Sequence, residues 1–340
     1  MENLVAYSLV AVYSAMGVYT IAFILFTLDL AKRSVSATDA ASASAEAAKN
    51  ARSAGATAGA ASATSSARGS TTTIERAAPA GASARSTDGP SGGTRFQKAA
   101  VALAAIGWVL HLAAVLTRGI AAERVPWANM FEFGLTATAL GMGTFLGALL
   151  WKDIRYLGAY ITGFSLLALG IVTTNFYVDV VPTPPPLQSA WLVIHVLVAS
   201  LATGFFAIGA GLSIMQLIRS RAAASKAEGL RFVHTLPGAS ALESLAYRVN
   251  VVGFVFWTFT LIAGAIWAER AWGRYWGWDT KEVWTFIIWT LFAGYIHARA
   301  TRGWRGDRSA WLAIIGFSAV IFNYTVVNLF FKGLHSYSGL

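Results

Sequence analysis

The chain alternates between long apolar blocks and shorter polar segments. Eight blocks contain about 20 mainly apolar residues each, the length that an α-helix needs to cross the hydrocarbon core of a bilayer. They cover residues 5–30, 98–118, 128–151, 156–175, 189–217, 248–268, 283–300 and 310–332. The regular alternation of apolar and polar residues that a membrane β-barrel requires is absent. This pattern predicts an all-α polytopic membrane protein with about eight transmembrane helices.

Residues 34–97 interrupt the apolar pattern. They consist almost entirely of Ala, Ser, Gly and Thr with scattered charges. Because such a segment buries too little apolar surface to offset the entropy of ordering it, we predict a long disordered cytoplasmic linker. The chain would then comprise a first transmembrane helix (1–33), the linker (34–97) and a seven-helix bundle (98–340).

Lysine and arginine are distributed unevenly between the loops. If the N-terminus faces outward, most of the 26 Lys and Arg residues fall in inner segments, and the outer side keeps only Arg118, Arg124, Arg270, Arg274, Lys281 and Lys332. The positive-inside rule then predicts an N-out, C-out topology. The net charge of +10 therefore indicates membrane orientation rather than nucleic-acid binding. The sequence has no cysteine, which excludes disulfides and thiolate metal sites on this chain.

Aromatic residues cluster in the outer loop 269–284. This loop contains Asp279 between four tryptophans, with glycines at 273 and 277; the tryptophans are Trp272, Trp276, Trp278 and Trp284. Single tryptophans are common at membrane interfaces, but an interfacial belt is spread over many helices rather than concentrated in one loop. Indole faces offer stacking area, and glycine allows close backbone approach. The composition therefore fits the binding of a planar, mostly apolar macrocycle.

The five histidines lie at different depths under this topology. His195, near the outer end of the fifth block, and His335, beyond the last block, share the depth of the tryptophan loop. His297 lies near the inner end of the seventh block, His111 lies inside the second, and His234 in an inner loop is assigned no role. Two neutral imidazoles flanking an aromatic surface match what bis-His ligation of haem iron requires, although each alone is also compatible with packing.

These residues carry a family resemblance. The order of His195, the Trp-Gly-x-x-Trp-x-Trp-Asp motif at 272–279, His297 and Gly-Leu-His-Ser-Tyr at 333–337 resembles the haem-handling proteins of cytochrome c biogenesis. Within them it is similar to the CcsA/ResC type of System II, called CcsB in actinobacteria, whose tryptophan-rich loop is known as the WWD motif. The resemblance covers roughly residues 98–340 and implies a multi-pass protein of the bacterial cell membrane with its active loop on the extracytoplasmic side.

The resemblance also implies ligands and roles. Haem b would be held at the outer face between His195 and His335, and His297 would ligate a second haem within the membrane. The opposite ligand of that second haem would come from a ResB/Ccs1-like membrane subunit. His111 is left open between ligation, lining the haem path and packing. A further motif of the family appears as Arg118, Pro126, Asn129 and Glu132.

A mechanism follows from these roles as an expectation. The tryptophans Trp272, Trp276, Trp278 and Trp284 would cradle the ring, and Arg270, Arg274 and Lys281 would offset the charge of the propionates. Asp279 would fix the loop by accepting backbone amides. The chain would belong to a holocytochrome c synthase (haem lyase) complex that attaches haem to the Cys-x-x-Cys-His motif of apocytochrome c. The apocytochrome thiols would be kept reduced by a thioredoxin-like thiol reductase.

Three other functions are compatible with parts of the sequence. A CcmC- or CcmF-like protein of System I would deliver haem to a separate chaperone, but these types have fewer spans or a much longer chain. A quinone-linked b-type cytochrome requires paired histidines at two membrane depths, and only His111 and His297 are candidates. A small-solute transporter would be supported by intramembrane carboxylates, for which Asp29, near a block end, is a candidate.

Overall fold

The structure is a computed structural model that describes residues 2–62, 94–180, 187–225, 233, 236–301 and 303–335. The described residues form long helices joined by loops, and a 3₁₀ turn, η1, lies at Arg155–Leu157. The helices are α1 (Glu2–Ser62), α2 (Arg95–Ala122), α3 (Met130–Ala148), α4 (Gly158–Asn175), α5 (Ala190–Ser225), α6 (Ala239–Trp272), α7 (Thr280–Thr301) and α8 (Asp307–Phe322). A π-helical turn, η4 (Asn323–Val327), and the short α9 (Asn328–Phe330) continue α8.

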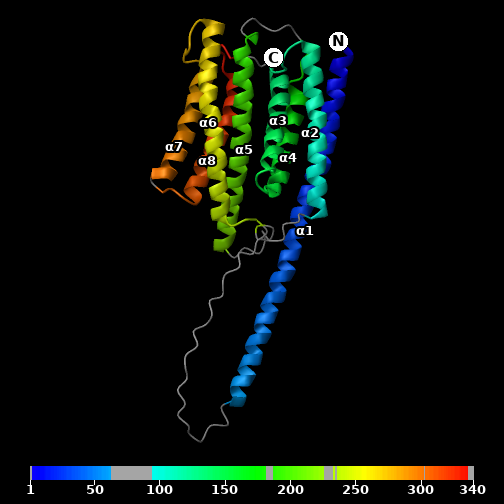
Figure 1. The fold of residues 1–340 in the computed structure, drawn as a ribbon, viewed down its shortest axis with the longest axis vertical. Coiled ribbons are helices and arrows are strands. Elements are labelled where there is room, and N and C mark those ends of the chain that lie inside the picture. Colours follow the sequence, from blue (N-terminus) through cyan, green and yellow to red (C-terminus); the bar gives the residue numbers. More distant parts are fainter. Residues whose placement is uncertain are drawn as a thin grey trace.

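Six of the described helices, namely α1, α2, α4, α5, α6 and α8, are long and apolar enough to cross a membrane. Large apolar side chains also cover their outward faces, as at Val10, Leu116 and Val255, each 63% exposed. Apolar side chains on both the inner and outer faces of a helix are suited to a lipid surrounding. The expected all-helical multi-pass membrane protein is therefore confirmed. The helices α3 and α7 run beside these six (Figure 1).

The structure does not confirm a disordered linker over residues 34–62. Helix α1 continues through this segment to Ser62 and projects beyond the bundle (Figure 1). The segment is rich in alanine, which has the highest intrinsic helix propensity, and the membrane-embedded part of α1 supplies the nucleus from which the helix extends. The rest of the predicted linker, residues 63–93, lies outside the described residues.

Helix α1 is also part of the bundle rather than a separate element. Its residues Val12 and Tyr19 are fully buried in a core shared with α2, α3, α4 and α5. Further along α1, Asp29 forms an ion pair with Arg33 at 2.8 Å. Its carboxylate also accepts a hydrogen bond from the hydroxyl of Thr94, the residue just before α2. Residues 98–340 alone therefore do not complete the core.

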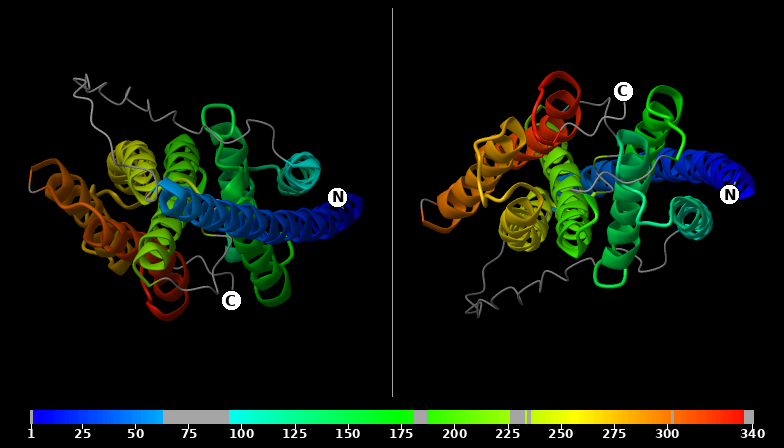
Figure 2. Two further views of the ribbon diagram at one scale, coloured as in Figure 1. Left: turned by 90° about the horizontal axis from the view of Figure 1, so that it is seen from below. Right: turned by 90° about the horizontal axis from the view of Figure 1, so that it is seen from above.

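A second hydrophobic core joins α5, α6, α7 and α8. Views along the bundle (Figure 2) show α5 between the two groups of helices, and it contributes residues to both cores. One end of the bundle holds the start of α1, residues 123–129 between α2 and α3, residues 273–279 between α6 and α7, and the turn at 331–335 (Figure 1). We call it the upper end. It brings together the segments that carry the sequence motifs.

Candidate functional site

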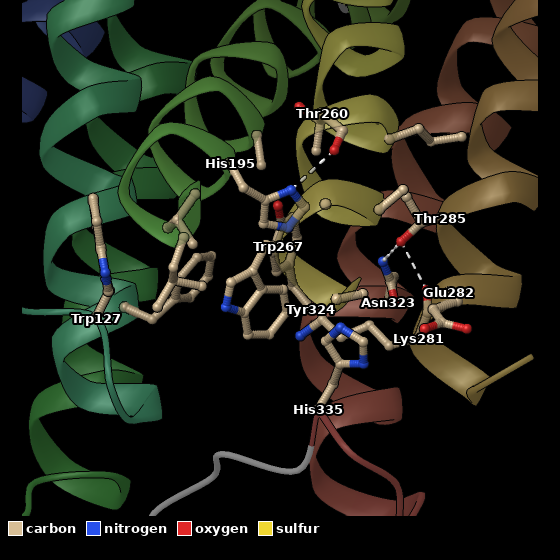
Figure 3. A pocket seen from close by; sticks show the side chains of 18 of the residues that line it. Trp127, His195, Thr260, Trp267, Lys281, Glu282, Thr285, Asn323, Tyr324 and His335 are labelled. Atoms are coloured by element: carbon tan, nitrogen blue, oxygen red, sulfur yellow. Dashed lines mark hydrogen bonds between the residues drawn. The ribbon is translucent and has the colours of Figure 1, made fainter. Parts of the chain in front are cut away.

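A cavity of about 130 Å³ lies at the upper end, where α3 meets α5, α6, α7 and α8 (Figure 3). Its walls are mainly aromatic and aliphatic, with a few polar side chains. Such a lining is typical of sites for small organic ligands. The residues that line the cavity include Asn129, His195, Thr260, Gly264, Trp267, Trp276, Lys281, Glu282, Asn323, Tyr324, Asn328 and His335.

His195 projects into this cavity from the first turns of α5. Its Nδ1 lies 2.9 Å from the carbonyl oxygen of Thr260 on α6. Because a carbonyl can only accept, Nδ1 carries the proton and Nε2 keeps a free lone pair in the neutral ring. The imidazole stacks on Trp267, with 6.0 Å between ring centroids and 18° between planes. One hydrogen bond and one ring contact thus fix both the tautomer and the orientation.

Gly264 makes room for this imidazole. A Cβ atom at position 264 would lie 2.7 Å from Cε1 of His195. We expect Gly264→Ala to push the ring out of place and to destabilise the protein by about 1–3 kcal/mol through overpacking. Thermal unfolding in detergent measures this loss. The control is Gly294→Ala, because a Cβ there meets nothing within 4 Å; equal behaviour of the two variants would contradict the prediction.

His335 reaches the same cavity from the turn that follows α9. Its Nδ1 donates to Oδ2 of Asp279 at 2.7 Å, and this hydrogen bond holds the pKa of the Asp279 carboxyl below its usual range. The carboxylate is therefore ionised at neutral pH, and Nε2 of His335 is left with the free lone pair. Trp267 and Trp272 pack edge-on against the ring at 5.4 and 4.8 Å between centroids.

The two histidines therefore offer the same chemistry to one cavity. In each, Nδ1 is held by an oxygen acceptor, an arrangement that orients metal-binding histidines and leaves Nε2 to ligate. Both rings lie beside Trp267 (Figure 3). In the part of the chain that the structure describes, no group of three or more His, Asp or Glu side chains could hold a metal ion.

Asp279 has a more specific role than the sequence indicated. Its Oδ1 accepts the backbone amide of Leu334 at 3.3 Å while Oδ2 accepts His335. Gly333 permits this approach, because a Cβ there would lie 2.1 Å from Oδ1. Glu282, the third residue of α7, instead accepts hydrogen bonds from the backbone amides of Gly277 and Asp279 at 2.8 and 3.1 Å. The contact with Asp279 is the one that the glutamate of a capping box makes. Asp279 therefore positions the C-terminal turn.

The tryptophans of the loop do not act as one surface. Trp272 contacts His335, and Trp276 lines the cavity. Trp278 has a positive φ of 60° and is 75% exposed, with only its edge near Trp276. Trp284 lies outside the cavity and packs on Phe322 of α8 at 4.3 Å between centroids. Of the four predicted tryptophans, only Trp276 lines the cavity, and Trp272 contacts His335.

The predicted arginines also lie outside the cavity lining. The guanidinium of Arg274 covers Gly277, where a Cβ would lie 1.5 Å from it. Arg270 lies over the ring of Trp191, 5.9 Å from its centroid. Of the three cations expected near the ligand, only Lys281 lines the cavity.

The other two candidate histidines have different surroundings. His111 is fully buried, and its Nε2 donates to the carbonyl of Leu135 at 2.9 Å while Nδ1 faces the hydroxyl of Tyr19 at 3.4 Å. With both nitrogens occupied, it packs α1, α2 and α3 together. His297 lies on an exposed face in the last turns of α7, away from the cavity. The structure therefore does not bring either residue to the upper site.

The arginine–glutamate motif after α2 is a buried charge cluster. Glu132 is fully buried and pairs with Arg118 at 3.3 Å and with Arg124. It also accepts the amide of Ala128 at 3.1 Å, and Asn129 caps α3 by accepting the amide of Glu132 at 2.9 Å. These contacts fix the loop that carries the cavity residues at 127 and 129.

Several cavity residues escaped the sequence analysis. Trp257, Thr260, Gly264 and Trp267 recur at helical spacing along one face of α6, and all line the cavity. The spacing was visible, but an aromatic residue within an apolar block usually indicates core packing. The η4 turn places Asn323 and Tyr324 in the cavity as well; π-helical turns often occur at functional sites.

The fold and site together define a polytopic helical membrane protein with an aromatic cavity between two oriented imidazoles. A family model described as "Cytochrome C assembly protein" matches residues 127–335. This range begins and ends at cavity residues, Trp127 and His335. The chain belongs to the cytochrome c assembly protein family.

Curated relatives define the type within this family. The chain is 36% identical over 244 residues to the cytochrome c biogenesis protein CcsA of Guillardia theta, covering 66% of this chain and 80% of that protein. It is 35% identical over 297 residues to CcsA of Synechococcus sp. strain JA-2-3B'a(2-13), covering 68% and 83%. The expected resemblance to the CcsA type is thus confirmed, and with it a role in cytochrome c biogenesis.

A solved structure shares the fold. The cytochrome c haem lyase CcmF superposes with a TM-score of 0.59 at 16% sequence identity, covering 94% of this chain. This chain spans less than half of that protein, since the match covers 46% of it. At this level of identity the likeness concerns the fold alone.

Proposed function

We propose that the protein binds haem b at the outer face of the bacterial cell membrane and presents it for covalent attachment to apocytochrome c. The observation that carries this proposal is the pair His195 and His335, which line one cavity with Nε2 of each ring available. Two replaceable imidazoles hold the iron until a histidine of the apocytochrome displaces one of them. Trp267, Trp272 and Trp276 provide ring contacts around the macrocycle.

The attachment step needs no redox partner in this chain. Each thioether forms when a cysteine S–H adds across a haem vinyl group, giving one C–S bond and one C–H bond. The cysteines must arrive as thiols, and this chain has no cysteine with which to reduce them. A thioredoxin-like thiol reductase is therefore a separate component of the pathway. The chain's own residues hold and orient the haem.

The haem must also enter the site. Pockets for ligands of this kind measure about 300–1,000 Å³, whereas the cavity here measures about 130 Å³. Entry therefore requires the walls to separate.

The proposed topology has eight spans with both termini outside, so that the upper end faces away from the cytoplasm. The helices α3 and α7 complete the eight, and their polar residues are accounted for by the cavity and charge cluster that they line. The distribution of Lys and Arg supports this orientation.

A ResB/Ccs1-like subunit is the proposed membrane partner in a System II holocytochrome c synthase. His297 supports this, since it is exposed on α7 in the apolar part of the bundle. An ionisable residue facing lipid is costly unless it has a partner. A second haem bridging His297 and a ligand of the partner subunit would cover it.

Co-expression tests the proposal. The full chain is expressed with its ResB/Ccs1-like partner and a cytochrome c in cells that lack their own assembly system, and covalent haem is measured in the cytochrome. We expect assembly with the wild type and loss of assembly with His195→Ala at equal protein level. The control Trp284→Phe, whose ring packs outside the cavity, keeps it. Assembly that persists without His195 would contradict the proposal.

A further inference from the structure

One corner of the cavity, where the starts of α3 and α7 meet α9, holds a lysine without an ion-pair partner and an amide donor without a hydrogen-bond partner among the described residues. Lys281, the second residue of α7, lines the cavity. Its ammonium donates to Oδ1 of Asn328 and lies 5.6 Å from the ring centroid of Tyr324. Both partners are neutral. Within the described ranges, no carboxylate forms an ion pair with this lysine.

Asn129 supplies a second donor to this corner. Its Oδ1 caps α3 by accepting the amide of Glu132, whereas its Nδ2 has no partner among the residues that the structure describes, although Asn129 is only 5% exposed. The sulfur of the next residue, Met130, accepts a hydrogen bond from Nδ2 of Asn328 at 3.3 Å. Because Asn328 also accepts a hydrogen bond from Lys281, it links the start of α3 to the lysine. We call Lys281, Asn328 and Asn129 the donor corner.

The geometry points to the donor corner as the binding site for a carboxylate of the ligand, namely one propionate of haem. This inference rests on the proposed function. A carboxylate would supply the negative charge that Lys281 lacks and accept from Nδ2 of Asn129, and such charge-assisted hydrogen bonds are strong where water is excluded. The corner shares the cavity with His195 and His335, so one molecule can contact the imidazoles through its iron and the corner through its edge.

Of the cations at the upper end, the cavity lining includes Lys281 but neither Arg270 nor Arg274. A carboxylate in the cavity therefore meets Lys281 instead of these arginines. The neighbouring Glu282 lines the cavity too, and its Oε1 has no hydrogen-bond partner within the described part of the chain. Its other oxygen is held by the amides of Gly277 and Asp279. The carboxylate therefore enters on the side of Lys281 and not on that of Glu282.

Capping the propionates as esters tests the inference. The purified full chain in detergent is titrated with ferric haem and with ferric haem dimethyl ester, and the two dissociation constants are measured from the Soret band. We expect the wild type to bind haem about tenfold or more tightly than the diester. Lys281→Met should remove this preference and leave the affinity for the diester unchanged, whereas Lys281→Arg should keep it.

Two further variants separate the corner from general effects of charge. Asn129→Asp retains the cap on α3, since aspartate caps as well as asparagine, but replaces the free donor with an acceptor. It should reduce the preference for the free acid. Arg270→Met removes a cation from the same end of the bundle without touching the cavity and should change nothing.

The outcomes decide the inference separately from the proposed function. If Lys281→Met weakens haem and its diester equally, or if the wild type does not discriminate between them, the donor corner does not bind a propionate while haem binding stands. If the wild type binds neither ligand, the haem assignment is wrong and this inference falls with it.

Discussion

Replacing Asp279 by alanine is expected to weaken haem binding by about 10- to 100-fold, nearly as much as removing His335 itself. Asp279 makes no contact with iron in this account. Its carboxylate accepts hydrogen bonds from the His335 imidazole at 2.7 Å and from the Leu334 amide at 3.3 Å. Without these bonds, the turn at 331–335 is no longer held, and the His335 ring can carry its proton on Nε2 instead of Nδ1. Titration of the purified protein with haem measures the effect.

The conservative variant and a distant carboxylate serve as controls. Asp279→Asn retains one acceptor oxygen, and we expect an intermediate loss. Asp153→Ala removes a carboxylate that lies just before η1 and is paired with Arg155. Neither of these two residues lines the cavity. This variant should bind haem as the wild type does. Full affinity in Asp279→Ala would show that the turn is held by other contacts.

Replacing Glu132 by glutamine is expected to lower the stability of the protein by about 3–5 kcal/mol. The side chains of Arg118 and Glu132 are 1% and 0% exposed, and Arg124 contacts the same carboxylate. Glutamine keeps the shape of glutamate but leaves two arginines without their shared counter-charge. The temperature of thermal unfolding in detergent should fall, and the yield of folded protein should fall with it.

A second substitution tests the electrostatic cause. Adding Arg124→Met to Glu132→Gln removes one of the stranded cations, so part of the lost stability should return; contacting residues give such non-additive effects. Glu123→Gln changes an exposed carboxylate in the same loop and should be neutral. A Glu132→Gln protein as stable as the wild type would mean that the cluster does not depend on its charge.

Much of the architecture could be predicted from the apolar blocks, and the exceptions have physical causes. Two of the helices carry buried carboxylates with structural roles, namely Glu132 of α3 in the charge cluster and Glu282 of α7 beside the cavity. The alanine-rich segment after residue 33 lacks the apolar residues of a core, yet alanine's helix propensity extends α1 through it. The composition of residues 34–62 predicts that few side chains there are buried, but it does not exclude a helix.

Residue types in the sequence suggest candidates for the site, but they do not give the backbone directions that place the side chains. His195 and His335 both line one cavity. Trp278 and Trp284 are neighbours of Trp276 in the sequence, but a positive φ at 278 and the start of α7 turn them elsewhere. The pairing of Asp279 with His335, 56 residues apart, depends on how the C-terminal turn folds back. No local pattern reports such a contact.

The central claim is that His195 and His335 bind one iron from opposite sides. Low-temperature EPR of the ferric protein tests it most directly, in the wild type and in His195→Gly and His335→Gly. We predict a six-coordinate low-spin spectrum for the wild type and a five-coordinate high-spin spectrum for each variant, with added imidazole restoring the low-spin form in both. A low-spin spectrum that survives unchanged in either variant would contradict the account.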